Sequence, residues 1–300
     1  MIDFTNLPTR NKCYAGANGV KRAVIYRDEQ YMLKFPSKAP KNKDLNYANS
    51  CISEYIGCHI FNSVGITAQE TILGVYRKGG VEKIVVACKD FTSPGIVLQD
   101  FASLKNTVIN SSHNGYGTEL TGIMQAMDEQ TAFSPPLLKQ YFWDVFIVDA
   151  LIGNWNRHNG NWGVLYNTTT DEVSIAPVYD CGSSLYPQAD EAIMRATLEN
   201  QPQRDLRTFS QPLSVVKINN QQINYFDFIS SYWSTSRCTA ERAAWAAYIS
   251  RFCALLNRLN SSGVSSALPN RRCCAFSAAL SASVFSFFFI DSVSYDCYHS

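Results

Sequence analysis

The stretch that most constrains the fold is an apolar run, Tyr141 to Ile152, that leads directly into the polar sequence GNWNRHNGN, Gly153 to Asn161. The apolar residues continue a stripe that begins after Ser134-Pro135-Pro136, which is typical of a helix start. We therefore predict a buried helix that ends at this loop. A second polar cluster, Tyr179 to Gly182, follows a segment with strand-like alternation. Two such clusters attached to apolar elements indicate an active site rather than a core.

Composition and charge exclude some classes of protein. A chain of 300 residues, 46% hydrophobic and 17% charged, can bury a sizeable core as one large or two-lobed unit. The net charge of +1 gives no basic footprint, so we expect no nucleic-acid partner. Ten cysteines without a C-x-x-C pair predict reduced, mostly buried thiols. The first residues lack the basic and apolar segments of a cleaved signal peptide, so we expect a cytoplasmic protein.

The N-terminal part is typical of an antiparallel sheet with one helix. Residues 12–36 predict strand, turn, strand, turn, strand, in which Arg22–Tyr26 pairs with Tyr31–Phe35 around Asp28-Glu29. A helix with apolar residues at helical spacing follows, from about Leu45 to Ile60. Two further strands and a connector to the second half of the chain complete this part: Thr71 to Tyr76, Ile84 to Ala87, and Cys88 to Phe91.

Three features of this part are compatible with binding an anion. The turn around Gly16-Ala17-Asn18-Gly19 would let backbone N–H groups approach an anion, although most such turns are ordinary hairpins. Lys34 follows Leu33 in an apolar strand end and points to the opposite face. It would either reach phosphates or lie on a solvated face. Glu54, inside the following helix, would either position Lys34 or face solvent.

The second half predicts helices, one hairpin and a tail. Residues 104–120, rich in Asn, Ser, Gly and Thr, predict a surface loop. Trp162–Tyr166 and Val173–Ala176 predict a hairpin, and a long helix is expected from about Thr239 to Leu259. Cys273 to Ile290 has no charged residue and approaches the length of a membrane span. Its serines favour a buried or partly disordered tail over a membrane contact.

Four polar motifs resemble, in order, those of the HipA-like serine/threonine kinases. Asn154 to Asn161 is similar to the N-x-D-R-H-x-x-N catalytic loop, and Tyr179-Asp180 to the metal-binding Asp of that family. Leu33 to Pro36 resembles its nucleotide-binding lysine strand, and Ser53 to Tyr55 its first-helix Glu. The matches cover about residues 12–260. The chain also resembles members of this family that are proinflammatory kinases of pathogenic bacteria and enter host cells, and this resemblance is compatible with secretion by a route that needs no signal peptide.

The resemblance implies an α+β, two-lobed, protein-kinase-like fold that uses ATP and Mg²⁺ to phosphorylate Ser or Thr of a protein substrate. It divides the chain into a nucleotide-binding lobe (1–88), a catalytic lobe (89–262) and a tail (263–300). Asn161 and Asp180 would hold Mg²⁺, while His158 would either contact the nucleotide or hold the loop. The positions expected to form the nucleotide site are Gly16, Ala17, Asn18, Gly19, Lys34, Glu54, Ala87, Cys88, Lys89 and His158.

The chain departs from this pattern at Asn156, where the family has Asp. An amide cannot accept the substrate proton as a carboxylate does, and loss of a general base costs on the order of 10²- to 10⁴-fold in rate. Asp149 comes too early in the motif to replace it. Three functions stay open at this point: a protein kinase, a pseudokinase that serves as a nucleotide-binding interaction module, and a small-molecule phosphotransferase.

Overall fold

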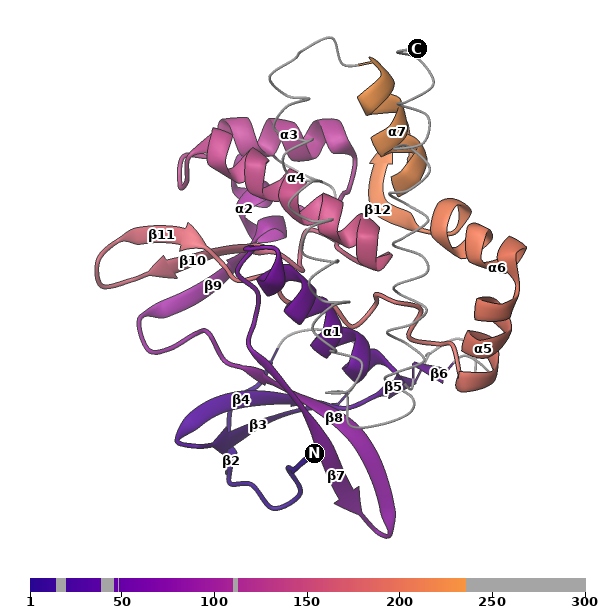
Figure 1. Cartoon of the computed structure of the whole chain (residues 1–300). Coiled ribbons are helices and arrows are strands. Elements are labelled where there is room, and N and C mark those ends of the chain that lie inside the picture. Colours follow the sequence, from indigo (N-terminus) through magenta and orange to yellow (C-terminus); the bar gives the residue numbers. More distant parts are fainter. Residues whose placement is uncertain (15–19, 39–45, 48, 110–112, 236–300) are drawn as a thin grey trace.

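The computed structural model describes residues 1–14, 20–38, 46–47, 49–109 and 113–235. Within these residues the chain has a mainly β lobe, which contains the N-terminus, and a mainly helical lobe (Figure 1). This arrangement confirms the predicted two-lobed α+β fold. The helix expected from Thr239 to Leu259 and the tail from residue 263 onwards lie outside the described residues.

A six-stranded sheet with the order β1-β7-β8-β4-β3-β2 forms the first lobe. Its strands are β1 (Ile2–Asp3), β2 (Thr9–Arg10), β3 (Lys21–Tyr26), β4 (Glu29–Lys34), β7 (Thr71–Lys78) and β8 (Val81–Lys89). Neighbours are antiparallel except for β1 and β7. The predicted pairing of β3 with β4 is confirmed, but the turn falls at Arg27 and Asp28. Both have positive φ, as a two-residue hairpin with the right-handed strand twist requires.

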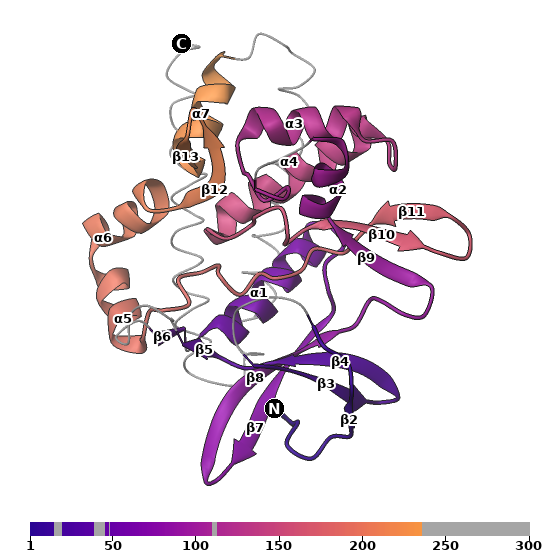
Figure 2. The ribbon, with the colours of Figure 1, turned by 180° about the vertical axis from the view of Figure 1, so that it is seen from behind.

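Helix α1 (Ser50–Ser63) lies between the sheet and the helical lobe (Figure 2). It begins later than the predicted Leu45 and ends at Ser63, slightly beyond the predicted Ile60. Cys51 packs with Val86 and Cys88 of the sheet, while Phe61 belongs to a core cluster that includes residues of the helical lobe. Because α1 is packed on both sides, the side chains of its interior are held between the lobes. A short pair, β5 (Ser37–Lys38) and β6 (Asn46–Tyr47), precedes it.

The second lobe combines helices with two small sheets. Its helices are α2 (Phe101–Val108), α3 (Leu120–Glu129), α4 (Pro135–Ile152), α5 (Glu191–Glu199), α6 (Gln201–Asp205), the π-helix η1 (Leu206–Ser210) and α7 (Tyr225–Thr235). Its strands are β9 (Ile96–Asp100), β10 (Gly163–Asn167), β11 (Glu172–Ile175), β12 (Leu213–Ile218) and β13 (Gln221–Asn224). The predicted helix α4 and the predicted β10–β11 hairpin are both confirmed.

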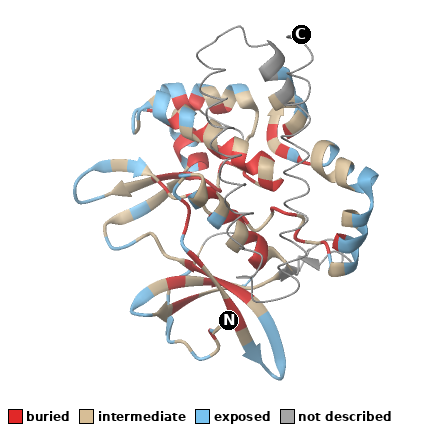
Figure 3. Cartoon of the chain, viewed as in Figure 1, coloured by how far each residue is buried: buried red, intermediate tan, exposed pale blue. Residues whose placement is uncertain are grey.

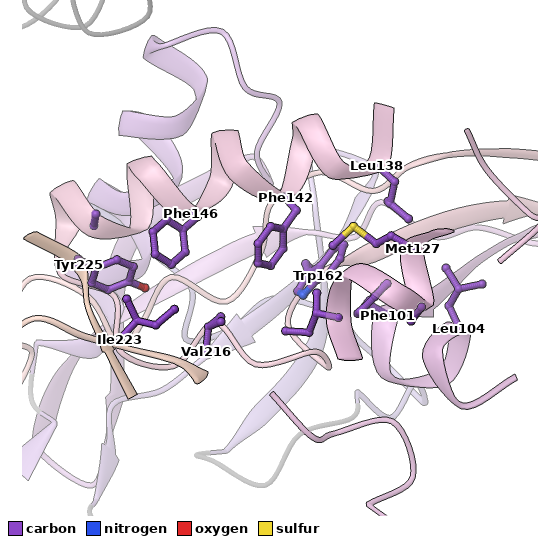
Figure 4. Close-up of a cluster of buried hydrophobic side chains, with 13 residues drawn as sticks. Phe101, Leu104, Met127, Leu138, Phe142, Phe146, Trp162, Val216, Ile223 and Tyr225 are labelled. Carbon is purple, nitrogen blue, oxygen red and sulfur yellow. The ribbon is translucent and has the colours of Figure 1, made fainter. Parts of the chain in front are cut away.

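Aromatic side chains dominate the core of the helical lobe (Figure 4). Phe101 and Trp162 stack with their ring centroids 4.0 Å apart, and Phe142 of α4 lies beside Trp162. Phe146, one turn further along α4, packs against Tyr225 of α7. Burying each such side chain stabilises the fold by roughly 1.5–3 kcal/mol. This packing fixes α4, which carries buried residues from Leu138 to Ile152 (Figure 3), and therefore fixes the loop that follows it.

The prediction of a loop for residues 104–120 is wrong over its first part, because α2 extends to Val108. The Asp100 side chain accepts a hydrogen bond from the Ser103 N–H at 2.8 Å and caps this helix, while Phe101 and Leu104 are buried beneath it. Ser103, Asn106 and Thr107 occupy the exposed face of α2, whereas Lys105 is buried. Among the described residues, no helix has the length and hydrophobicity needed to cross a bilayer.

Candidate active site

The end of helix α4 sets the direction of the polar loop that follows. Gly153 adopts the left-handed conformation, with φ of 59°, and its N–H donates to the Ala150 carbonyl. The Asn154 N–H donates to the Asp149 carbonyl at 2.9 Å, which closes the last turn. Glycine is favoured at such a position because it has no Cβ to clash. The chain therefore leaves the helix abruptly, between the two lobes.

Arg157 connects the loop to α4 and to the segment around Asp180. Its Nε donates to Asp149 Oδ2 at 2.8 Å and its Nη2 to Asp149 Oδ1 at 3.1 Å. Nη1 donates to the carbonyls of Asn161, at 2.9 Å, and of Tyr179. Both side chains of the ion pair are buried. Although burial opposes its charge, Asp149 raises the pKa of Arg157 well above its usual range. Asp149 is thus a structural partner of Arg157.

Hydrogen bonds within the loop involve the backbone of Asn156. Its N–H donates to Asn154 Oδ1 at 3.1 Å, and its carbonyl accepts from Asn161 Nδ2 at 2.8 Å. The His158 N–H also donates to the Asn156 carbonyl, at 2.9 Å, and His158 Nδ1 accepts from the Gly160 N–H at 3.1 Å. Burial lowers the pKa of His158, so its ring is neutral at physiological pH. His158 therefore helps to hold the loop.

Lys34, Glu54 and Asp180 meet opposite this loop. Lys34 Nζ lies 3.0 Å from Glu54 Oε2 and 3.0 Å from Asp180 Oδ1. The Glu54 side chain is 1% exposed, whereas that of Asp180 is 43% exposed. Although burial opposes the charge, the carboxylates of Asp180 and Glu54 raise the pKa of Lys34 well above its usual range. The charge of Lys34 lowers the pKa of Asp180 to about 2. A cation and an exposed carboxylate are therefore both charged at neutral pH.

A cavity of about 730 Å³ contains both groups of residues. Its lining includes Lys34, Glu54 and Asp180, which contact one another, and Asn156, His158 and Asn161 of the loop. Sites for small molecules and cofactors commonly have volumes of roughly 300–1,000 Å³. The structure thus brings together six of the residues predicted from sequence, although Lys34 and Asp180 are 146 positions apart.

The remaining predicted positions are placed differently. Gly16, Ala17, Asn18 and Gly19 lie outside the described residues. Ala87, Cys88 and Lys89 are the last residues of β8, and they do not line the cavity, although Val86 of the same strand does. Ala87 and Cys88 are buried in the sheet, and Lys89 pairs with Glu29 at 2.6 Å. The predicted connector therefore begins only at Asp90, and a nucleotide contact by these three residues stays a prediction.

Asp90, at the start of the connector, was not assigned a role from the sequence. Its carboxylate accepts hydrogen bonds from Tyr14 and Gln30 at 2.7 Å each and pairs with Lys12, also at 2.7 Å. Burial opposes ionisation, but the hydrogen bonds from Lys12 and Thr92 lower the pKa of Asp90 to about 2. The network ties the connector to the sheet. Tyr14 and Gln30 lie 76 and 60 positions from Asp90 in sequence, so no local pattern predicts these contacts.

Lys21 is a second cation at the cavity that sequence reasoning missed. It is directly opposite Lys34 in the β3–β4 pair, and it lines the same cavity. Like charges on directly opposed residues destabilise a sheet unless other charges compensate. Burial, followed by the charge of Lys34, lowers the pKa of Lys21. Two ammonium groups on this side of the cavity would favour a polyanionic ligand.

Asn161 and Asp180 are suitable ligands for Mg²⁺. The described residues contain no cluster of three or more His, Cys, Asp or Glu that could hold a metal. Mg²⁺, however, is commonly bound through one or two carboxylates, with waters and phosphate oxygens as its other ligands. Asp180 is ionised, and the Asn161 amide nitrogen is bonded to the loop, so its oxygen is the atom that a cation would meet. This donor set fits Mg²⁺ bound together with a phosphate ligand.

Comparison with known families agrees with this geometry. A family model described as the HipA-like C-terminal domain matches residues 9–245. The chain belongs to this family. Among the HipA-like proteins, the serine/threonine-protein kinase CtkA of Helicobacter pylori is 46% identical over 231 residues, which cover 76% of this chain and 70% of CtkA.

The fold is shared with the same relative. The crystal structure of the Helicobacter pylori proinflammatory kinase CtkA matches with a TM-score of 0.82 and 37% identity, over 100% of this chain and 99% of that one. The resemblance to HipA-like kinases inferred from the catalytic-loop and lysine-strand motifs is therefore confirmed, and so is the kinase-like fold class.

Proposed function

We propose that this HipA-like protein is an ATP- and Mg²⁺-dependent protein serine/threonine kinase. The observation that carries the proposal is the convergence of Lys34, Asp180 and the Asn156–Asn161 loop on one cavity. Phosphoryl transfer depends on positioning and charge neutralisation more than on covalent help from the protein. The similarity to CtkA, which is named a serine/threonine kinase, supports the same function.

Each residue has a role that follows from its charge and position. Lys34, oriented by Glu54, would hold phosphate oxygens of ATP as a point charge. Asp180 and Asn161 would hold Mg²⁺, which when bound neutralises charge that develops on the transferred phosphoryl group. In the structure Lys34 pairs with Asp180. When Mg²⁺ and phosphate bind, Asp180 would contact the metal and Lys34 the phosphate, and these contacts would replace the ion pair.

Asn156 would orient the acceptor hydroxyl. The hydroxyl oxygen of a protein Ser or Thr would attack the γ-phosphorus as the bond from phosphorus to the leaving oxygen of ADP breaks. Because the Asn156 amide cannot take up the proton of this hydroxyl, the proton would be released to solvent. We therefore expect a slow kinase. We also propose the division expected from the sequence, a nucleotide-binding lobe over residues 1–88 followed by a catalytic lobe, with the boundary moved to Asp90 because β8 extends to Lys89.

Binding of Mg-ATP should raise the melting temperature, because a ligand that binds only the folded state stabilises it. At a concentration about 100 times the dissociation constant, we expect a rise of roughly 5–10 °C. Lys34→Ala combined with Asp180→Ala should abolish the rise, because both the phosphate cation and the metal carboxylate are lost. Thermal unfolding with and without Mg-ATP measures this difference.

An exposed ion pair provides the matched control. Arg77 and Glu82 lie 2.7 Å apart on neighbouring strands, and their double alanine variant should keep the full rise. Because removing Lys34 leaves the buried Glu54 unpaired, Asp180→Asn is a second test that preserves this pair. Asn tolerates the positive φ of residue 180, which is 59°. An undiminished rise in both variants would contradict the assignment.

Lys21→Met should weaken ATP binding by about tenfold, corresponding to 1.4 kcal/mol, because one of two cations facing the phosphates is removed. Adenosine, which carries no phosphate, should bind equally well to both proteins. Isothermal titration with ATP and with adenosine gives both affinities. Lys83→Met, which removes an exposed lysine of β8, is the control and should not alter either affinity.

Two other functions are distinguished by their acceptors. The amide at position 156 favours a pseudokinase, which would bind Mg-ATP but transfer no phosphate. A small-molecule phosphotransferase would label small acceptors and no protein. Incubation of the purified chain with radiolabelled ATP, once with a protein acceptor and once with a panel of small alcohols and amino acids, separates these cases.

A further inference from the structure

The turn His113 to Tyr116 is anchored on both sides to the catalytic lobe. The Tyr116 N–H donates to the His113 carbonyl at 2.9 Å, and the two residues between them have positive φ. A Cβ at Gly115 would overlap the Ala102 carbonyl, so the turn lies directly against the backbone of α2. Such close packing allows only glycine at this position.

Two buried side chains hold the carbonyls on either side of Tyr116. Asn159 Nδ2 donates to the Gly115 carbonyl at 2.7 Å and to the Gly117 carbonyl at 3.0 Å. Lys105 Nζ donates to the Gly117 carbonyl at 2.6 Å. Both Asn159 and Lys105 are buried. Because Asn159 also belongs to the catalytic loop, the turn and the loop form one rigid unit.

This rigid support carries an exposed aromatic ring. Tyr116 is 51% exposed, although the groups that hold its backbone are buried. Its ring lies edge-on to His158, with centroids 6.0 Å apart. A Cβ at Gly160 would lie 3.0 Å from Tyr116 Cε1, so the absence of a side chain there lets the ring rest on the loop. Tyr116 thereby lines the same cavity as Asn156 and Asn161.

We propose that Tyr116 positions the acceptor segment of the substrate, by packing against an apolar side chain next to the Ser or Thr of an extended polypeptide. This inference rests on the proposed kinase function. Tyr116 and the groups that hold it all belong to the catalytic lobe, whereas the phosphate-binding Lys34 belongs to β4 of the first lobe. An exposed tyrosine on a rigid support gives a large contact area at a small entropy cost, as in many protein-binding sites.

The test separates acceptor binding from nucleotide binding. Steady-state transfer of radiolabelled phosphate from ATP to casein is compared for the unsubstituted chain, Tyr116→Ala, Tyr116→Phe and Leu137→Ala. For Tyr116→Ala we expect the KM for casein to rise about tenfold, with kcat changed less than about threefold and the KM for ATP unchanged. Tyr116→Phe keeps the ring and should retain the KM. Leu137, exposed at the start of α4, is the matched control.

A second measurement tests the chemistry of the neighbouring residue. Two synthetic peptides share one Ser, flanked on both sides by Leu in one and by Asn in the other. The unsubstituted chain should prefer the Leu peptide by about tenfold in kcat/KM, and Tyr116→Ala should lose this preference. An unchanged KM for casein, or a parallel rise in the KM for ATP, would overturn the role of Tyr116 alone. No transfer to casein or to either peptide, with ATP binding intact, would overturn the kinase function and this inference together.

Discussion

Asn156→Asp should increase the rate of phosphate transfer to protein by at least about 100-fold, because a carboxylate can accept the proton of the attacking hydroxyl. The affinity for ATP should change little. The loop hydrogen bonds at this position use the backbone N–H and carbonyl of residue 156, and Asn and Asp are nearly the same size. The exchange therefore leaves the loop intact. Single-turnover rates with radiolabelled ATP, together with ATP titrations, measure the two effects.

A matched variant distinguishes the carboxylate from other changes at this position. Asn156→Ala should stay as slow as the unsubstituted chain or slower, with unaltered ATP affinity. Equal rates for the Asn and Asp forms would argue against a role for residue 156 in accepting the proton. Asp149 is not the alternative base, because it is buried and both of its oxygens accept hydrogen bonds from Arg157.

Arg157→Met should destabilise the folded protein by about 3–5 kcal/mol, because it leaves the carboxylate of Asp149 buried without its partner. For a protein of this size, the loss corresponds to a fall of roughly 6–20 °C in melting temperature. Thermal unfolding gives the value. Adding Asp149→Leu should recover part of the stability, since the unpaired buried charge is then removed as well.

An ion pair on the surface serves as the control for the Arg157→Met variant. Arg195 and Glu191 lie 2.7 Å apart on α5, with the arginine side chain 62% exposed. Arg195→Met should change the stability by less than about 1 kcal/mol, because solvent screens such a pair. If Arg157→Met and Arg195→Met had equal effects, the buried pair would not hold the loop to α4.

The elements that sequence predicted best have strong, uninterrupted patterns. Helix α4 has a broad apolar stripe with prolines at its start and glycine at its end, so both boundaries were predictable. The β10–β11 hairpin alternates around a polar turn. The prediction of a loop failed at α2 because the polar residues of this helix outnumber the buried Phe101 and Leu104, and composition alone then favours a loop. The cap at Asp100 was a usable signal that composition obscured.

Only those residues of the site that belong to short sequence motifs could be predicted. The loop residues and Asp180 lie in polar clusters, and the motif resemblance identified Lys34 and Glu54. The sequence analysis included Arg157 in the loop motif, but its buried role depends on Asp149, one of two acids in the largely apolar helix α4. A charged side chain in a buried part of a helix requires a partner, so the position of Asp149 could have predicted a buried cation. Lys21 and Tyr116 gave no signal, since their positions follow from strand register and from the packing of a distant turn.

The sequence separation of the contacts in the site has a consequence for the order of folding during synthesis. The Lys34–Asp180 contact spans 146 positions, and the Tyr225 hydroxyl donates to the Asn154 carbonyl across 71 positions. Contacts between distant residues form late and slowly. A nascent chain therefore completes the nucleotide-binding side of the cavity only once residue 180 has left the ribosome. It secures the catalytic loop only after residue 225 has followed. Until then, we expect the emerging polypeptide to have no phosphotransferase activity.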